Sequence, residues 1–200
     1  MIKNIVFDFG QVLVRFDPAY MVGCYVTDAR DAKLLTDVIF DRLYWDRLDA
    51  GTITDKEVMD GVRSRIPERL HASAEKIYYN WIYNIPEING MRELLTELRL
   101  RGFRLYLLSN ICTYFAAHRD EIPMLKLLDG CVFSAEAGFV KPSREIYDHL
   151  TAEFGIRADE TVFVDDREEN IRGAIAAGWN GILFNGDAAE LRQKLADMSS

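Results

Sequence analysis

Hydrophobic positions follow two patterns in this chain. Residues 4–9 (NIVFDF) are almost continuously apolar, as expected of a buried strand. Similar short apolar runs occur at 103–110, 131–135, 161–166 and 181–184. They alternate with segments whose apolar residues have helical spacing, at 88–102, 143–155, 167–178 and 188–198. Strands alternating with helices of this length predict an α/β fold: a Rossmann-like three-layer α/β/α core with a parallel sheet.

The segment 15–87 has a different hydrophobic pattern, because it contains no convincing strand. Apolar residues at helical spacing occur at 28–48, 54–66 and 73–85, and Gly51, Pro67 and Pro86 mark the breaks. Thr54 followed by Glu57 predicts a capping box at the start of the second helical segment. We therefore expect an all-helical insertion after the first strand, which leaves 1–14 and 88–200 as the α/β core domain and 15–87 as a second domain.

Composition excludes several classes of protein. The formal net charge is −8, which disfavours nucleic-acid binding because phosphate backbones require a surplus of Lys and Arg. Three cysteines without CxxC spacing argue against a disulfide framework and a zinc site. No apolar run approaches the ~20 residues that span a bilayer, and the N-terminus does not resemble a signal peptide. We expect a cytoplasmic protein with free thiols and no membrane partner.

Polar residues gather at the predicted carboxyl ends of the strands. Asp8 ends the first strand, Ser109 and Asn110 end the second, and Asp165 and Asp166 end the strand at 161–166. Lys141 lies in a loop directly before a predicted helix. Each of these alone is ordinary turn or cap chemistry. Because ligands of open parallel sheets bind outside the carboxyl ends of the strands, their combination at one edge predicts a site.

The residue types at this edge suit phosphoryl chemistry. Asp8 and one of the carboxylates Asp165 and Asp166 form an oxygen-rich site that suits Mg²⁺. A carboxylate can also attack phosphorus and form an aspartyl phosphate. Hydroxyl, amide, ammonium and backbone N–H donors can then hold the oxygens of the transferred group.

Four segments carry a resemblance to a known family. "VFDFGQVLV", "LLSN", "KP" and "VFVDDREEN", in this order, resemble the four motifs of the haloacid dehalogenase superfamily of phosphohydrolases. The insertion at 15–87 resembles the small α-helical cap of that superfamily. The "FDxGxV" form of the first motif is similar to that of bacterial phosphatases acting on small sugar phosphates such as α-glucose 1-phosphate. The resemblance implies a Mg²⁺-dependent phosphatase, with Mn²⁺ as an alternative metal.

The resemblance also implies residue roles. Asp8 would be the nucleophile and a metal ligand, with the backbone carbonyl of Gly10 and the carboxylate of Asp166 as further ligands. Asp165 would orient Lys141 or a water on the metal, and Asn170 would help to hold Asp166. The phosphate would be bound by Gly10 through its backbone N–H and by the side chains of Ser109, Asn110 and Lys141, of which Lys141 is also catalytic.

One position departs from the family pattern. Most phosphatases of this superfamily carry a second Asp two residues after the nucleophile, where this chain has Gly10. Such an acid–base group contributes ~10²–10⁴-fold to the rate. Three interpretations remain open: a phosphatase that uses water or a cap side chain instead, a binding or regulatory protein that has lost catalysis, and a haloacid dehalogenase. The Asp165–Asp166 pair disfavours the last, because it would repel an anionic haloacid.

Substrate choice is expected to reside in the insertion, since the sheet edge binds the phosphate. Aromatic residues are frequent there, and Tyr44 and Trp45 are candidates for stacking on a sugar. Arg15 and Asp17 either face the site or form a solvated pair. We expect a small phosphorylated metabolite, most simply a sugar phosphate, as the substrate. The sequence leaves open whether the protein is a monomer or a dimer.

Overall fold

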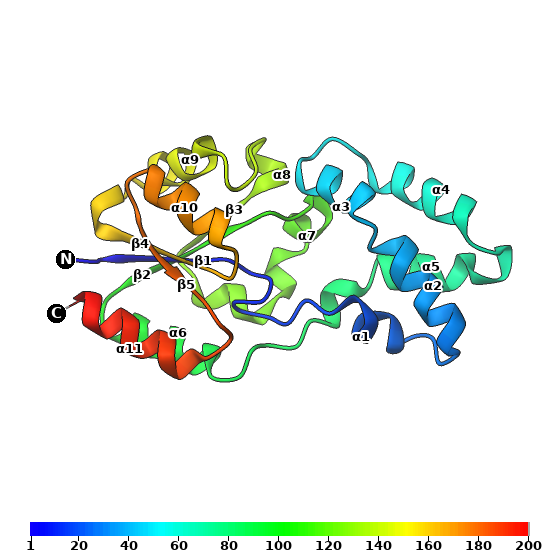
Figure 1. Cartoon of the computed structure of the whole chain (residues 1–200), viewed down its shortest axis with the longest axis horizontal. Coiled ribbons are helices and arrows are strands. Elements are labelled where there is room, and N and C mark those ends of the chain that lie inside the picture. Colours follow the sequence, from blue (N-terminus) through cyan, green and yellow to red (C-terminus); the bar gives the residue numbers. More distant parts are fainter. Residues whose placement is uncertain (200) are drawn as a thin grey trace.

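The computed structural model describes residues 1–199, and these contain one parallel sheet in the order β3-β2-β1-β4-β5 (Figure 1). The strands are β1 (Asn4–Phe7), β2 (Arg104–Ser109), β3 (Gly130–Phe133), β4 (Thr161–Asp165) and β5 (Asn180–Leu183). Phe7, the last residue of the central strand, pairs with Leu107 of β2 and Val164 of β4. The residues that follow these three strands therefore meet at one edge.

Helices cover both faces of the sheet. Helices α6 (Met91–Leu100) and α11 (Ala188–Ser199) lie on one side, and α9 (Arg144–Phe154) and α10 (Glu168–Ala176) lie on the other (Figure 1). Alternate strand residues supply the two cores: Phe7 belongs to the same apolar cluster as α6 and α11, and Val6 to the cluster with α9 and α10. The predicted three-layer α/β/α core is confirmed.

The chain between β1 and α6 forms the helical insertion, which extends away from the sheet at the right of Figure 1. Its elements are α1 (Pro18–Gly23), α2 (Ala29–Ile39), α3 (Arg42–Asp49), α4 (Asp55–Arg65), η1 (Glu68–Leu70), α5 (His71–Tyr78) and η2 (Trp81–Tyr83). The predicted capping box is present, with Thr54 and Glu57 bonded reciprocally. The apolar periodicity at 28–48 divides into α2 and α3, because Asp41 caps a new helix by accepting from the N–H of Leu43.

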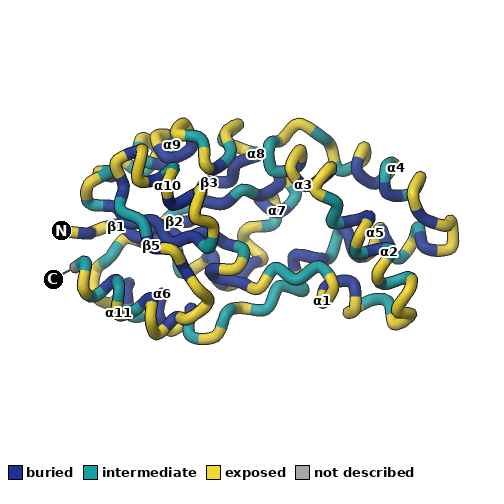
Figure 2. Tube along the Cα trace, viewed as in Figure 1, coloured by how far each residue is buried: buried dark blue, intermediate teal, exposed yellow. Residues whose placement is uncertain are grey.

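Two chain crossings join the insertion to the core, and they are bonded to each other. The N–H of Arg15 donates to Pro86 (2.7 Å), and the N–H of Ile88 donates to Leu13 (3.0 Å). Val14 and Glu87 form an antiparallel bridge between these bonds. Figure 2 shows buried segments in both the sheet and the insertion, and one apolar cluster includes residues of both. The crossings and this shared cluster hold the insertion beside the carboxyl edge of the sheet.

Short elements complete the core. They are α7 (Thr113–Ala117), η3 (Arg119–Glu121), η4 (Pro123–Leu127), α8 (Ser134–Ala137) and η5 (Ala158–Glu160). Helices α1 and α7 were not predicted, because five or six residues are too few for a periodic pattern. The cysteines are free thiols, with Cys112 buried and Cys24 exposed. None of the helices described in 1–199 has the length and apolar character needed to cross a membrane.

Candidate active site

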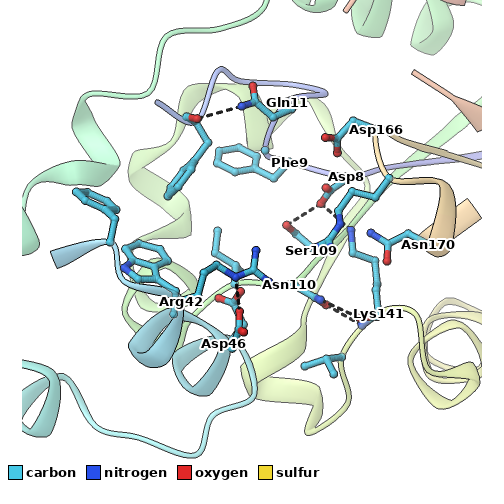
Figure 3. Close-up of a pocket in the computed structure, with 18 of the residues that line it drawn as sticks. Asp8, Phe9, Gln11, Arg42, Asp46, Ser109, Asn110, Lys141, Asp166 and Asn170 are labelled. Carbon is cyan, nitrogen blue, oxygen red and sulfur yellow. Dashed lines mark hydrogen bonds and ion pairs between the residues drawn. The ribbon is translucent and has the colours of Figure 1, made fainter. Parts of the chain in front are cut away.

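A cavity of about 470 Å³ lies where the carboxyl edge of the sheet meets the insertion (Figure 3). Its lining residues come from both parts of the chain. The core contributes, among others, Asp8, Gly10, Ser109, Asn110, Lys141, Asp166 and Asn170. The insertion contributes Phe16, Phe40, Arg42, Trp45, Asp46, Asp49 and Trp81. Seven of the eight residues selected from the sequence thus line one cavity, and the eighth, Asp165, is bonded directly behind it.

Lys141 is the centre of a buried charge network. Its Nζ lies 2.8 Å from Asp8 Oδ1 and 2.8 Å from Asp165 Oδ2. Burial lowers the pKa of Lys141, but the two adjacent carboxylates more than compensate, so the pKa is raised and the ammonium group stays charged at neutral pH. Burial raises the pKa of Asp8, and the neighbouring Lys141 ammonium partly offsets this rise. Nucleophile candidate and cation therefore form one unit.

Asp165 is held on all sides within the fold. Both of its oxygens accept bonds from the Asn170 amide, at 3.1 and 3.0 Å, and Oδ1 also accepts from the N–H of Arg167 at 2.8 Å. The expectation that Asn170 holds Asp166 is wrong, because the Asn170 amide bonds to Asp165 instead. Successive strand side chains point to opposite faces, and Asp165 is the one that faces the helix carrying Asn170. Asp165 thereby keeps Lys141 in place.

Ser109 ends β2 and Asn110 follows it, but the two side chains make different contacts. The Ser109 hydroxyl donates to Asp8 Oδ1 at 2.9 Å. The Asn110 side chain accepts from the N–H of Lys141 (2.8 Å) and donates to its carbonyl (3.1 Å). Asn110 lines the cavity and also fixes the backbone of the loop that carries Lys141. Its amide group is thus occupied by the protein itself, which the sequence did not indicate.

The carboxylates at this edge can hold a divalent cation. Asp8, Asp165 and Asp166 each offer one oxygen within 4.8 Å of the others. Burial and the charges of Asp165 and Asp8 raise the pKa of Asp166 to about 6, so a cation here would relieve repulsion. Asp165 already bonds to Lys141 and Asn170. Asp8 and Asp166 are therefore the carboxylates best suited to a hard ion such as Mg²⁺.

The turn after Asp8 exposes backbone groups. Its hydrogen bonds run from Gln11 N–H to Val14 and from Val14 N–H to Phe9. Among the described residues these bonds bypass the N–H and carbonyl groups of Gly10, which lines the cavity. A Cβ built on Gly10 would meet only Phe16 Cβ, at 3.7 Å, an ordinary contact. Packing at the Cβ position therefore does not exclude a side chain there.

The wall provided by the insertion is aromatic on one side. Trp45 is its centre, with ring centroids 5.2 Å from Phe40, 5.3 Å from Trp81 and 5.4 Å from Phe16. Tyr44, the neighbouring candidate, lies outside the cavity lining: its hydroxyl approaches Gly61 of α4, and Arg65 lies over its ring. Adjacent helical residues point about 100° apart, which explains why only one of the pair faces the cavity.

Helix α3 also brings three charged residues that the sequence analysis missed. Arg42, Asp46 and Asp49 all line the cavity, and Arg42 and Asp46 form an ion pair at 2.9 Å (Figure 3). Their i, i+4, i+7 spacing places them on one helix face, a signal that was present in the sequence. Arg15 and Asp17 are not part of the lining. They form an exposed pair at 3.9 Å, and Asp17 caps α1.

Comparison with known proteins identifies relatives of the entire fold. A model of the haloacid dehalogenase-like hydrolase family matches residues 2–178. A sesquiterpene phosphatase of Aspergillus oryzae is 29% identical over 195 residues, covering 96% of this chain and 95% of that protein. A D-ribitol-5-phosphate phosphatase of Bacteroides thetaiotaomicron is 28% identical over 180 residues, covering 86% of each.

A solved structure supports the same fold. It is a haloacid dehalogenase family enzyme of Bacteroides thetaiotaomicron in complex with magnesium and inorganic phosphate. The TM-score is 0.73 at 21% identity, and the alignment covers 96% of this chain and 99% of that one. At this identity the likeness concerns the fold.

Proposed function

We propose that this chain, which belongs to the haloacid dehalogenase-like hydrolase family, is a Mg²⁺-dependent phosphatase acting on a small phosphorylated metabolite. The observation that carries the proposal is the buried network of Asp8, Lys141 and Asp165 beside Asp166, at the edge of a cavity. The two curated relatives described above are both named as phosphatases, which supports the same reaction class. Residues 15–87 act in this proposal as a cap domain over a core of 1–14 and 88–200.

Asp8 is the proposed nucleophile. Ser109 and Lys141 both contact its Oδ1, so we assign the attack on phosphorus to Oδ2. The P–O ester bond breaks as the new bond forms, and an aspartyl phosphate results. The Lys141 ammonium and the Ser109 hydroxyl hold phosphoryl oxygens together with the backbone N–H of Gly10. Asn110 positions Lys141 through its backbone.

The metal fits the oxygen donors at this edge. Asp8, Asp166 and the carbonyl of Gly10 would hold Mg²⁺, with Mn²⁺ as an alternative, and Asp165 would stay bonded to Lys141. When bound, the ion supplies positive charge that stabilises the phosphoryl group during transfer. The magnesium complex of the Bacteroides enzyme supports this assignment.

The cavity favours a leaving group with an apolar face. The aromatic wall around Trp45 can stack on the C–H face of a sugar, and the Arg42–Asp46 pair can bond to hydroxyl groups. We therefore retain a sugar phosphate as the first candidate. An apolar alcohol phosphate is the second, because Phe16, Phe40 and Trp81 extend the wall and one relative is named as a sesquiterpene phosphatase.

A phosphate-release screen of purified protein tests the proposal. The panel contains sugar, sugar-alcohol, nucleotide and isoprenoid phosphates with Mg²⁺, and Asp8→Asn serves as the blank. We expect release that stops with a chelator and falls to background in Asp8→Asn, since an amide cannot act as the nucleophile. Halide release from haloacids that survives the chelator would instead indicate a dehalogenase. Mg²⁺-dependent ligand binding without phosphate release would indicate a binding protein.

A further inference from the structure

The proposed reaction needs a proton donor that Gly10 cannot provide. An alkoxide leaving group is a strong base, so its departure requires protonation, and the later attack of water requires a proton acceptor. Among the residues that the structure describes, the core part of the cavity lining offers no spare carboxyl group for this task. Asp165 is bonded to Lys141 and Asn170, and Asp8 and Asp166 are assigned to the nucleophile and the metal. The remaining carboxyl groups of the cavity lining are Asp46 and Asp49, both on α3.

Asp46 and Asp49 differ in their surroundings. Asp46 is exposed and forms the ion pair with Arg42. Asp49 is half-buried, and its Oδ1 is fully enclosed without a hydrogen-bond partner among the described residues. Asp49 lines the cavity, and this oxygen has hydrogen-bonding capacity that the protein leaves unused. Asp49 is thus the carboxyl group of α3 that combines burial with an oxygen left unpartnered among the described residues.

The backbone of Asp49 is fastened to the core. Its carbonyl accepts a hydrogen bond from the Ser134 hydroxyl at 2.6 Å, and the same hydroxyl accepts from the N–H of Ile111 at 2.9 Å. The chain then turns at Gly51, where a Cβ would lie only 2.9 Å from the carbonyl oxygen of Ala135. This close packing holds the end of α3 against α8, and Ser134 connects it to Ile111, the residue after Asn110.

The electrostatic surroundings keep Asp49 protonatable near neutral pH. Burial raises its pKa to about 7, with a further rise from Asp46 and a smaller one from Asp8. Arg42 and Lys141 act in the opposite direction. Cys112 is a further titratable group affected by this carboxyl, and burial raises its own pKa to about 12, so it stays neutral. A carboxyl group of this kind can both donate and accept a proton at physiological pH.

We propose that Asp49 is the general acid–base residue of this site, in the role for which Gly10 has no side chain; this inference rests on the proposed phosphatase function. In the first step Asp8 attacks phosphorus, the P–O bond breaks, and its electron pair takes the Asp49 proton, which releases the alcohol. In the second step the Asp49 carboxylate takes a proton from water as the water oxygen bonds to phosphorus. The Asp8–phosphorus bond breaks, which releases phosphate and restores both residues.

The test compares Asp49→Asn with wild type on two substrates that differ in leaving group. The isosteric amide keeps the backbone bond to Ser134, and thermal melting and circular dichroism verify the fold. For an alkyl phosphate from the panel, we expect kcat/KM to fall ~10²–10⁴-fold. For p-nitrophenyl phosphate, whose leaving group needs no proton, we expect less than ~5-fold loss, because kcat/KM reports only the first step.

The pH profile provides a second readout. In wild type, kcat/KM for the alkyl phosphate should fall as the pH rises through about 7, since Asp49 loses its proton there. Asp49→Asn should lack this limb, whereas Asp60→Asn, an exposed carboxyl of α4 paired with Lys56, should retain it together with wild-type rates.

The outcomes separate the two proposals. Equal losses on both substrates would reduce Asp49 to a structural role and overturn the inference, as would an unchanged alkyl phosphate rate. Absence of phosphate release by the wild-type protein from any substrate would instead refute the proposed function itself.

Discussion

At the scale of single residues, the site depends on one buried lysine. Lys141 balances two carboxylates, and its side chain is 1% exposed. Removing one partner of a buried charge network leaves an uncompensated charge, which costs far more than the intact pair contributes. The side chain that holds the phosphate in the proposed reaction is therefore also one that the fold cannot lose without penalty.

Lys141→Met should consequently destabilise the protein as well as inactivate it. We expect a loss of ~3–5 kcal/mol in the free energy of unfolding, because Asp165 stays buried without its cation. Urea denaturation measures this. The control is Lys3→Met, which removes an exposed ion pair with Glu160 and should cost at most ~1 kcal/mol. Equal, small losses in both variants would contradict a charge-balancing role for Lys141.

Sequence reasoning succeeded for those residues whose position follows from the sheet. The parallel order places Asp8, Ser109 and Asp165 at one edge whatever the details of packing. It failed where the direction of a side chain decides the contact. Asn170 bonds to Asp165 and not to Asp166, because strand alternation, and not proximity along the chain, determines which carboxylate faces α10.

At the scale of elements, the position of α3 is the main unpredicted feature. Its charged face was readable as helical spacing of Arg42, Asp46 and Asp49, but nothing in that spacing says which surface the face contacts. The contact depends on tertiary packing: Ser134 at the start of α8 and the close approach at Gly51 hold the end of α3 on the core. By contrast, the start of α4 was predicted, since its capping box is a purely local signal.

Ser134→Ala should therefore loosen α3. The hydroxyl is fully buried and serves both Asp49 and Ile111, so its loss leaves two backbone groups without a partner. We expect ~1–3 kcal/mol lower stability in chemical denaturation. A matched control is Ser64→Ala, where an exposed hydroxyl bonds to the carbonyl of Gly61 and the cost should stay below ~0.5 kcal/mol.

If Asp49 acts as we infer, Ser134→Ala should also lower kcat/KM for an alkyl phosphate more than for p-nitrophenyl phosphate. The reason is that the misplaced carboxyl affects only the step that needs a proton. A stability loss with identical proportional effects on both substrates would mean that Ser134 supports the fold alone.

At the scale of the whole molecule, the arrangement of insertion and core explains how one chain separates two tasks. In the proposed reaction the sheet edge supplies the charges that hold the phosphate, and the insertion supplies the aromatic wall and Asp49. The paired crossings near Val14 and Glu87 let the insertion be placed over that edge with few connections. Hydropathy patterns predicted that two such parts exist. They did not predict which residues of the insertion face the sheet, because helical periodicity identifies a buried face but not the surface against which it packs.

The carboxylate cluster makes the stability of the entire fold sensitive to metal. Lys141 pairs with Asp8 and Asp165 of the three clustered aspartates, so repulsion involving Asp166 remains that a divalent cation would remove. A ligand that binds only the folded state stabilises it by ~2.7 kcal/mol at a hundred times its Kd. For a chain of this size that corresponds to a Tm increase of roughly 5–10 °C.

We expect this increase on adding Mg²⁺ to the metal-free protein, measured by calorimetry, and its absence in Asp166→Asn. Lys33→Met, which removes an exposed ion pair with Asp37, should keep the full increase. An equal Mg²⁺ effect in Asp166→Asn would place the ion elsewhere and remove Asp166 from the proposed ligand set.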